Sequence, residues 1–537
     1  MSNKILFENA RIITMQKEIP LADNMLIEDS QILDLNVKRS VHGDAEVYDL
    51  QGKTVLPGLN DSHIHMLVTG VKEFDMVDLR GAKSVGEIQS RVRQHIDENP
   101  PRGDEWVIGW GWNDTKFKEN DSLTRWALDD VTETYPTFLT RVCGHVGVMN
   151  TAALKRTNID AATEVEGGEI DTDRNNNITG IVREAARLLV YKSIPDYSVE
   201  EIKKYLKKAG KMFRKSGLTA VQTDDLVEVI GSKDRILQAY RELLEENALP
   251  LRVILKLRLH SPGEVEKYIV EKPEFDFRNY DRFNMGPLKL FADGSLGGKT
   301  ASLKAPYRKE NDNYGIMVNS PHKLETMIEV ACQNDIQVAC HAIGDRAMEI
   351  VLNILEKMKE RYGSLNRPRI VHAQVTNLNL IDRIKELGAV VDVQPPFVGS
   401  EWYHAEDVLG QQRSFNTYAW KTMMNKGITV AGGSDSPVES FKPFPGIRCA
   451  VTRQNKNNEP AGGWQPGEKV TTHEALKMYT VNSAYSGCQE NNIGKLAQGY
   501  RADFIAIDRD PFSIPADELD SINVKTSVVG GEIEEYQ

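Results

Sequence analysis

The sequence predicts an α/β protein whose central part consists of repeated strand–helix units. From about residue 198, amphipathic helical segments alternate with short runs rich in Val and Ile, often separated by a glycine. A glycine there suits a left-handed helix cap, and apolar runs are typical of parallel strands buried on both faces. We therefore expect a TIM-like (β/α)8 barrel. Its eight strands are predicted at 59–65, 218–223, 252–258, 287–292, 336–341, 369–373, 389–394 and 428–433.

The two ends of the chain differ from this central part. Residues 4–55 alternate short apolar runs with turn residues, which predicts antiparallel strands, and "ADFIAIDRD" near the C-terminus repeats the pattern. We expect one small β-sandwich from residues 1–56 and 486–537, because chain ends often lie close together, with the barrel over 57–485. About 130 residues separate the first two barrel strands, so about 72–182 are predicted to form an inserted cap.

Composition narrows the class of protein. The formal net charge of −12 argues against nucleic acid or an anionic membrane as partner. No apolar run approaches the roughly 18 residues needed to span a bilayer, and the N-terminal segment has no signal-peptide pattern. Five scattered cysteines suit a reducing compartment better than a disulfide framework. We expect a cytoplasmic protein with a small-molecule substrate, for which a homodimer would be unsurprising.

Several metal-ligand residue types stand where the predicted barrel strands end. His63 and His65 lie on one face of the first strand, His341 and His372 end the fifth and sixth, and Asp435 follows the eighth. Functional side chains of such barrels gather at this end. Imidazole and carboxylate are preferred ligands of zinc and similar ions, and a metal with an open position makes hydroxide available from water. The two histidines of "HIH" alone could merely pack together; the whole set predicts a metal site.

Lys289, on the fourth predicted strand, allows two interpretations. It could extend out of the barrel mouth or pair with Asp293, as lysines commonly do. Alternatively, burial would leave a neutral amine, which reacts with carbon dioxide to give a carbamate able to bridge two cations.

These segments together resemble the amidohydrolase superfamily. The resemblance is carried by "PGLNDSHIH", "LKLFADGSLGGKTA", "HAIGDRA", "RIVHAQ", "GGSDSPV" and "TVNSAYSGCQENNIGKLAQGYRADFIAID". It is closest to the branch of the N-substituted formamide deformylases and related metal-dependent hydrolases, and it covers nearly the whole chain. One departure is Lys299 in "GGKTA", where the family often has arginine, which puts any bidentate contact there in doubt.

The resemblance implies a binuclear metal centre. His63, His65 and Asp435 would hold the first metal, His341 and His372 the second, and a carbamylated Lys289 would bridge them. Two zinc ions are the default expectation, although iron, cobalt, nickel or manganese would also suit such ligands.

The sequence thus predicts a metal-dependent hydrolase that cleaves the C–N bond of a small N-substituted amide or formamide by metal-activated hydroxide. Asp435 would hold the water, accept its proton and pass the proton to the leaving nitrogen. Lactone, phosphoester or deamination chemistry on the same scaffold is an alternative, because fold and metal do not decide the substrate. A non-catalytic metal-binding regulator is a further one. The glycine-rich "ADGSLGGKT" and "GGSDS" lack the spacing of a phosphate-binding loop, so no nucleotide cofactor is expected.

The inserted segment supplies candidates for substrate binding. Trp110 and Trp112 in "GWGWND" could line an apolar pocket or be ordinary core residues. Arg141 and His145 resemble a pocket-lining segment of the same branch. His145 could donate to a substrate carbonyl or be a buried, hydrogen-bonded histidine.

Overall fold

An eight-stranded, nearly closed parallel sheet forms the centre of the larger unit of the chain. The computed structural model describes residues 4–38, 45–114, 117, 122–141, 145–165, 168–184, 186–227, 231–270, 277 and 280–537. The sheet order is β21-β20-β19-β18-β17-β16-β15-β8, and every neighbouring pair runs parallel. The strands are β8 (Leu59–Ile64), β15 (Leu218–Thr223), β16 (Arg252–Leu257), β17 (Phe283–Phe291), β18 (Val338–Ala342), β19 (Arg369–His372), β20 (Val390–Val393) and β21 (Val430–Gly432).

All eight strand positions predicted from the sequence are confirmed. The largest difference is at β17, which begins at Phe283 because that residue already pairs with Val253 of β16. Two backbone hydrogen bonds bridge the remaining edge between β8 and the segment after β21. Asp435 N donates to the His63 carbonyl over 2.7 Å, and His65 N donates to the Ser436 carbonyl over 2.8 Å. The first and last strands are thereby joined at the end where the predicted ligands lie.

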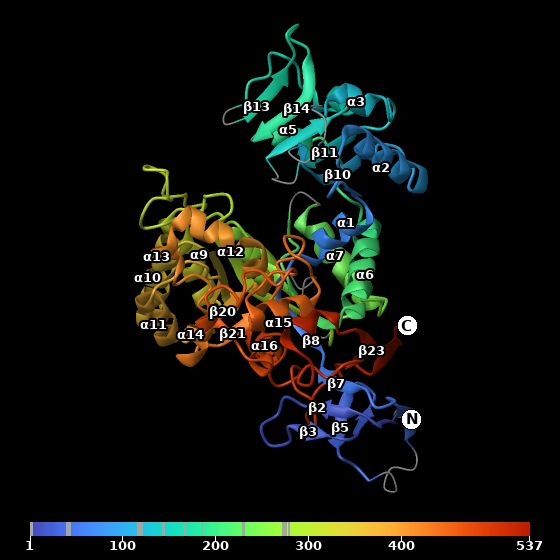
Figure 1. Ribbon diagram of the computed structural model, residues 1–537, viewed down its shortest axis with the longest axis vertical. Coiled ribbons are helices and arrows are strands. Elements are labelled where there is room, and N and C mark those ends of the chain that lie inside the picture. The colour runs from blue at the N-terminus through green and yellow to red at the C-terminus, as the bar shows by residue number, and fades with distance from the viewer. Residues whose placement is uncertain are drawn as a thin grey trace. The chain divides into compact units, whose positions relative to one another are not determined.

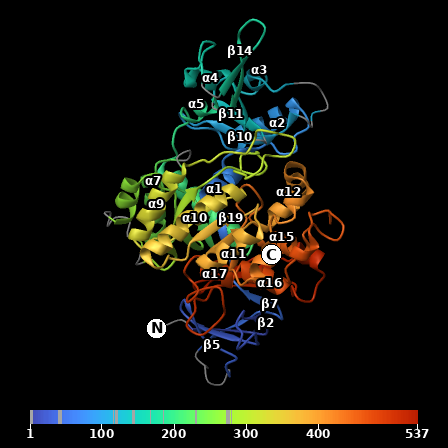
Figure 2. The ribbon, with the colours of Figure 1, turned by 90° about the vertical axis from the view of Figure 1, so that its left-hand side faces the viewer.

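Helices follow most of the barrel strands, as the alternating pattern predicts. Helices α9, α10 and α11 pack side by side, with α10 against β18 (Figure 2). None of the helices within the described ranges has the length and apolar character that crossing a membrane requires. The helices from α6 onward are α6 (Val199–Lys215), α7 (Lys233–Glu245), α8 (Pro262–Val265), α9 (Pro321–Gln333), α10 (Asp345–Tyr362), α11 (Leu378–Leu387), α12 (Pro395–Leu409), α13 (Gln411–Ser414), α14 (Trp420–Asn425), α15 (Pro443–Thr452), α16 (Thr472–Met478) and α17 (Val481–Ser486), with a π-helical turn η3 (Glu266–Val270) and 3-10 turns η5 (Pro466–Glu468) and η6 (Ala516–Ser521).

Strands from both ends of the chain meet in one sheet. The order β24-β23-β22-β7-β2-β3 places β22 and β23 beside β7 and β2, as the blue and red ribbons in Figure 1 show. A second sheet has the order β5-β4-β1-β6, and Phe7, Met25, Val55 and Phe504 of the two sheets pack in one apolar core. The strands are β1 (Lys4–Glu8), β2 (Arg11–Ile13), β3 (Leu21–Ala22), β4 (Met25–Glu28), β5 (Gln31–Leu35), β6 (Glu46–Asp49), β7 (Thr54–Pro57), β22 (Phe504–Ile507), β23 (Val524–Val529) and β24 (Glu532–Glu535).

The expectation that all the N-terminal strands are antiparallel is wrong for two pairs. Strand β6 runs parallel to β1, and β7 runs parallel to β2. Strands β4 and β5 occupy one edge of β1, so the chain must cross to the other edge before β6 can pair. A parallel pair needs such a crossover, whereas a short hairpin joins antiparallel neighbours.

A second compact unit comprises residues 67–205 and 227–236. Its sheet has the order β13-β14-β12-β11-β10-β9 and carries apolar cores that include Leu79, Val107 and Phe138. Its elements are α1 (Met66–Phe74), β9 (Val77–Asp78), α2 (Val85–Glu98), β10 (Val107–Trp112), α3 (Arg125–Asp129), β11 (Thr137–Arg141), β12 (Val146–Met149), α4 (Thr151–Thr157), β13 (Gly168–Thr172), β14 (Ile178–Glu184) and α5 (Arg187–Tyr191).

Candidate metal centre

Three of the predicted ligands form a compact cluster at the carboxyl ends of the barrel strands. One ligand atom from each of His63, His372 and Asp435 lies within 4.8 Å of the other two, and all three residues are buried. Nε2 of His63 is 3.5 Å from Oδ1 of Asp435, and the His63 and His372 ring centroids are 5.4 Å apart. Residues from β8, β19 and the segment after β21 thus meet at one point, because parallel strands end at the same rim of a barrel.

Both buried imidazoles in this cluster favour the neutral form. Burial, together with the nearby amines of Lys256 and Lys289, holds the pKa of His63 well below its usual range. Burial lowers the pKa of His372 to about 4, although Asp435 opposes the shift. Because only the neutral ring has a free nitrogen lone pair, these histidines are in the form that ligates metal near neutral pH.

Asp435 keeps its charge in spite of burial. Burial alone would raise its pKa, but the hydrogen bond to His65 and the nearby His372 bring the pKa down to about 2. Both Asp435 and His372 have positive φ, 57° and 77°. Non-glycine residues seldom adopt this conformation, and such strain is concentrated at functional sites.

His65 faces the same carboxylate. Its Nε2 is 3.1 Å from Oδ1 of Asp435, and its Nδ1 is 2.9 Å from the carbonyl oxygen of Asp224. A carbonyl only accepts, so Nδ1 carries a proton, and a neutral His65 would point the lone pair of Nε2 at a carboxylate oxygen. Burial opposes a positive charge on the ring, but Asp435 raises its pKa overall. A metal ion held by Nε2 would take the place of the ring proton that this contact with Asp435 favours.

The ring of His341 lies beside the cluster, and its centroid is 4.5 Å from that of His372. Its Nε2 is 2.8 Å from the carbonyl oxygen of Gly294 and 3.6 Å from Oδ1 of Asp293. Asp293 in turn accepts backbone N–H groups of Ser302, Ile343 and Gly344 at 2.8–3.0 Å. Asp293 therefore fixes the backbone after β18, which carries His341.

Lys289 is buried among these groups without a hydrogen-bond partner. Its residue is 1% exposed, and Nζ makes no hydrogen bond within the described part of the chain. The amine lies 4.5 Å from the centroid of the Phe291 ring. Burial lowers its pKa to about 8. A buried amine without a hydrogen-bond partner is energetically costly. Its presence therefore suits a site in which a further group contacts or modifies this amine.

The residues present therefore fit a divalent metal. The buried imidazoles of His63 and His372 and the ionised carboxylate of Asp435 form the donor set, and the amine of Lys289 makes no hydrogen bond within the described part of the chain.

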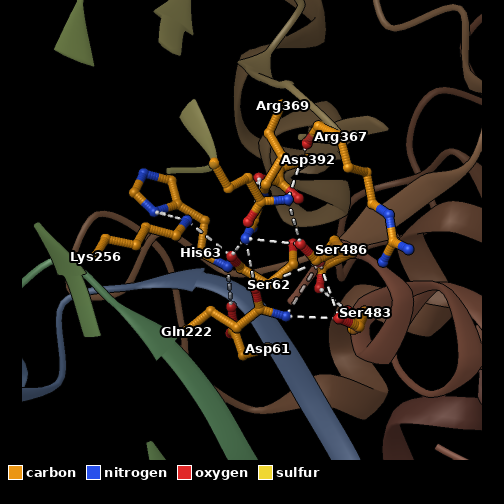
Figure 3. Close-up of polar contacts among 12 residues, drawn as sticks. Asp61, Ser62, His63, Gln222, Lys256, Arg367, Arg369, Asp392, Ser483 and Ser486 are labelled. Atoms are coloured by element: carbon orange, nitrogen blue, oxygen red, sulfur yellow. Dashed lines mark hydrogen bonds and ion pairs between the residues drawn. The ribbon is translucent and has the colours of Figure 1, made fainter. Parts of the chain in front are cut away.

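The sequence analysis did not identify the residues that hydrogen-bond to the His63 ring and to the backbone beside the metal ligands. Lys256, on β16, is fully buried, and its Nζ is 2.8 Å from the Ser62 carbonyl oxygen and 3.0 Å from Nδ1 of His63 (Figure 3). Asp61 accepts the backbone N–H groups of His63 and Ser434 at 3.0–3.1 Å. The sequence does show Lys256 as a lysine inside the apolar run "RVILKL", but the run does not indicate which residue this lysine contacts.

A buried ion pair lies beside Lys256 in the barrel. Arg369 donates to Asp392 through Nε and Nη2 at 2.9 and 2.7 Å, and through Nη1 to Gln222 over 2.7 Å (Figure 3). Its Nη2 also donates to the Ser62 carbonyl over 2.9 Å. Arg369 and Lys256 therefore both hold the backbone directly before His63.

The predicted substrate-binding residues belong to the second compact unit. Trp112 is 3% exposed and packs in an apolar core with Leu79 and Leu139. Arg141 donates to Asn113 and Asp114 at 2.8–3.0 Å. The packing of Trp112 matches the alternative that it is an ordinary core residue. A role of Trp112 or Arg141 in substrate binding stays a prediction.

The remaining candidates are engaged locally. His145 is more than half exposed, and its Nδ1 lies 2.9 Å from a carboxylate oxygen of Glu184. Trp110 makes a cation–π contact with Lys72, whose Nζ lies 2.8 Å from the ring centroid. Lys299, which replaces the usual arginine, forms an ion pair with Glu310.

Comparison with known proteins agrees with this geometry. A family model described as "Amidohydrolase family" matches residues 46–533. The chain belongs to the amidohydrolase family. It is therefore a hydrolase, as the motifs at the barrel strand ends predict.

Three similar proteins illustrate the relationship. The chain is 33% identical to "Putative amidohydrolase YtcJ" of Bacillus subtilis over 99% of both chains. It is 26% identical to the N-substituted formamide deformylase of Arthrobacter pascens, over 98% of this chain and 97% of that one. A crystal structure of an uncharacterized metal-dependent hydrolase from Pyrococcus furiosus superposes with a TM-score of 0.79 at 29% identity, covering 95% of this chain and 100% of the other.

Proposed function

We propose that this amidohydrolase is a metal-dependent enzyme that cleaves the C–N bond of a small N-substituted amide or formamide. The observation that carries the proposal is the cluster of His63, His372 and Asp435 at the barrel mouth, beside the unpartnered amine of Lys289. The similarity to a formamide deformylase supports the bond class.

The residues would divide the metal ligation as follows. His63, His65 and Asp435 hold one divalent ion, which we take to be zinc, and His341 and His372 hold a second. Bound there, the metal would polarise the amide carbonyl and lower the pKa of water. His63 and His372 contribute neutral imidazoles, and Asp435 contributes a charge that burial does not remove.

Lys289 would join the two ions after it reacts with carbon dioxide. A bond forms between Nζ and the carbon, a C=O electron pair moves onto oxygen, and Nζ releases one proton to water. The product is a carbamate with two oxygens on a long stem. The lowered pKa of Lys289, about 8, and its lack of a hydrogen-bond partner support this assignment.

Asp435 would move the proton during turnover. Its Oδ1 already lies within reach of His63 and His65, and the carboxylate is ionised near neutral pH. It accepts a proton from the attacking water and transfers it to the leaving nitrogen.

The division of the chain belongs to the same proposal. We take residues 1–56 and 486–537 as one β-sandwich domain, because its two sheets share an apolar core. Residues 57–485 form the hydrolase domain with a cap of about 72–182. The few scattered cysteines support a cytoplasmic location.

The experiment compares the parent protein with Asp435→Asn. We expect the purified parent to contain divalent metal by elemental analysis and to hydrolyse members of an amide and formamide panel. The variant should keep most of its metal and lose turnover by at least about 100-fold, the scale of general acid–base catalysis. Normal turnover by the variant would show that Asp435 is not the base.

The same metal-loaded preparation separates the rival functions. Lactones, phosphotriesters and substrates of deamination are tested beside the amides. Hydrolysis of one of these classes, with amides untouched, would replace the bond class but keep the site. Stoichiometric metal without turnover of any substrate would favour a non-catalytic regulator.

A further inference from the structure

A pocket of about 360 Å³ lies beside Lys289, between the ends of β16 and β17 and helix α9. We propose that it binds a substrate substituent that is apolar along its length and ends in an anion, such as an aryl group with a carboxylate. This inference rests on the proposed function, since it names the substrate class of the same site.

The walls of this pocket are mainly apolar. Leu259 follows β16, Leu290 lies in β17, and Leu324 and Met327 lie in α9; each is at most 5% exposed. Burying an aromatic ring against such side chains is favourable at about 25 cal/mol per Å² of apolar surface. Pockets of about 300 Å³ and more are large enough for small-molecule substituents.

Phe291 connects the pocket to the candidate metal centre. Its ring lies 4.5 Å from Nζ of Lys289, 4.6 Å from Cζ of Arg258 and 5.3 Å from the centroid of His341. A substituent that lies in the pocket therefore borders the same Lys289 and Phe291 that border the metal ligands. The reacting amide of that substrate would extend toward the cluster.

The ionisable side chains in the pocket wall are all basic. Arg258, His260, Lys289 and Lys323 contribute to the lining, and no carboxylate does so among the residues that the structure describes. An apolar cavity whose ionisable wall groups are all basic complements an anionic end group and disfavours a cationic one.

Arg258 is already positioned to contact such an anion. Its Nε and Nη2 donate to the carboxylate of Asp224 at 3.1 and 2.6 Å. Nη1 makes no hydrogen bond recorded within the described residues, and the side chain is 23% exposed. The pairing with Asp224 fixes the planar guanidinium, so Nη1 would bind an anion with little further loss of entropy.

Two matched formamides test the proposal. The parent enzyme is assayed by formate release with 4-formamidophenylacetate and with its neutral counterpart, 4-formamidophenylacetamide. We expect KM to be about 10-fold or more lower for the carboxylate, the scale of one charge-assisted hydrogen bond, with similar kcat. Equal KM values would overturn the proposal.

Variants assign the effect to the pocket. Lys323→Gln, on the exposed start of α9, should narrow the KM difference without affecting folding, and Arg258→Lys should narrow it further. Met327→Trp should raise KM for both substrates by filling the cavity. Lys211→Gln, which replaces an exposed lysine of α6 outside the pocket lining, is the matched control and should leave both KM values unchanged. A KM difference that survives both Lys323→Gln and Arg258→Lys contradicts the assignment.

A binding measurement keeps this test separate from the proposed function. Phenylacetate is titrated into the full-length protein and followed by NMR, with phenylacetamide as the neutral probe. We expect phenylacetate to bind more tightly and to weaken several-fold in Lys323→Gln. If neither formamide is hydrolysed, the proposed function fails while phenylacetate binding still supports the pocket. Binding that ignores charge, or that both variants leave unchanged, overturns the pocket assignment.

Discussion

Nζ of Lys256 lies 3.0 Å from Nδ1 of His63, which places a buried lysine directly behind a predicted metal ligand. For Nε2 of His63 to ligate a metal, Nδ1 must carry the ring proton and donate it. Burial and the nearby Arg369 hold the pKa of Lys256 well below its usual range, so a neutral amine is available as acceptor. The same Nζ donates to the Ser62 carbonyl.

The first prediction is that Lys256→Met weakens metal binding. Loss of the partner at Nδ1 should free the His63 ring and lower metal affinity by about 10- to 100-fold, as for other groups that orient metal ligands. Competition with a chromophoric chelator measures the affinity. Lys203→Met, which removes a lysine of similar burial from α6, is the control. Unchanged affinity in Lys256→Met would mean that His63 needs no such support.

The second prediction concerns the buried pair of Arg369 and Asp392. Arg369→Met leaves a carboxylate uncompensated in the barrel, where both residues are fully buried, and should cost about 3–5 kcal/mol of unfolding free energy. Denaturant unfolding followed by circular dichroism measures the loss.

A double variant distinguishes the charge effect from a packing effect. Arg369→Met combined with Asp392→Leu removes both charges, so it should recover a large part of the lost stability. If the double variant is as unstable as the sum of the two single ones, the cost lies in packing and not in the unpaired charge.

The barrel and its cluster could be predicted because both depend on local patterns. Buried parallel strands can be recognised in a sequence as apolar runs, and their carboxyl ends lie at one rim of the barrel. Once the strands were placed, His63, His372 and Asp435 were therefore expected to lie close together. Lys256 and Arg369 escaped prediction because their partners lie in other strands. Contacts between side chains so far apart in the sequence depend on how the barrel strands are aligned with one another. That alignment cannot be inferred from a local sequence pattern.

The position of the Trp112 ring could not be predicted from the sequence for a different reason. Strand alternation places Trp110 and Trp112 on one face of β10. The register with β11 shifts between these residues, and Gly111 between them has a φ of 99°. Trp112 packs in an apolar core, while Trp110 lies against Lys72. A bulge of this kind breaks the period of two, so alternation along the sequence does not state which way each ring points.

The third prediction is that Gly433→Ala damages the cluster. A Cβ at this position would lie 2.6 Å from the backbone N of His63 and 2.7 Å from Oδ1 of Asp61. These neighbours hold the first metal ligand, so the variant should lose about 1–3 kcal/mol of stability and part of its metal. Thermal unfolding and elemental analysis measure the two effects. Gly467→Ala, where a Cβ meets no atom within 4 Å, should behave as the parent; equal behaviour of both variants would contradict the predicted crowding.

The last prediction is a pH dependence that arises at Lys72. Burial lowers the pKa of this lysine to about 7 in the folded chain, where its Nζ lies 2.8 Å from the Trp110 ring centroid. An unfolded lysine titrates near about 10.4, so between about pH 7 and 10.4 the unfolded chain binds one more proton than the folded one. The stability of this unit should therefore rise with pH through that window, and below it the full cost of the partly buried charge is present. Lys72→Met removes the cost, and the variant should exceed the parent in stability at pH 6 by more than at pH 9. Hydrogen exchange of the β10 amides at the two pH values measures the difference, with Lys83→Met as an exposed control. A variant that is destabilised equally at both pH values would show that contact with Trp110 outweighs the buried charge.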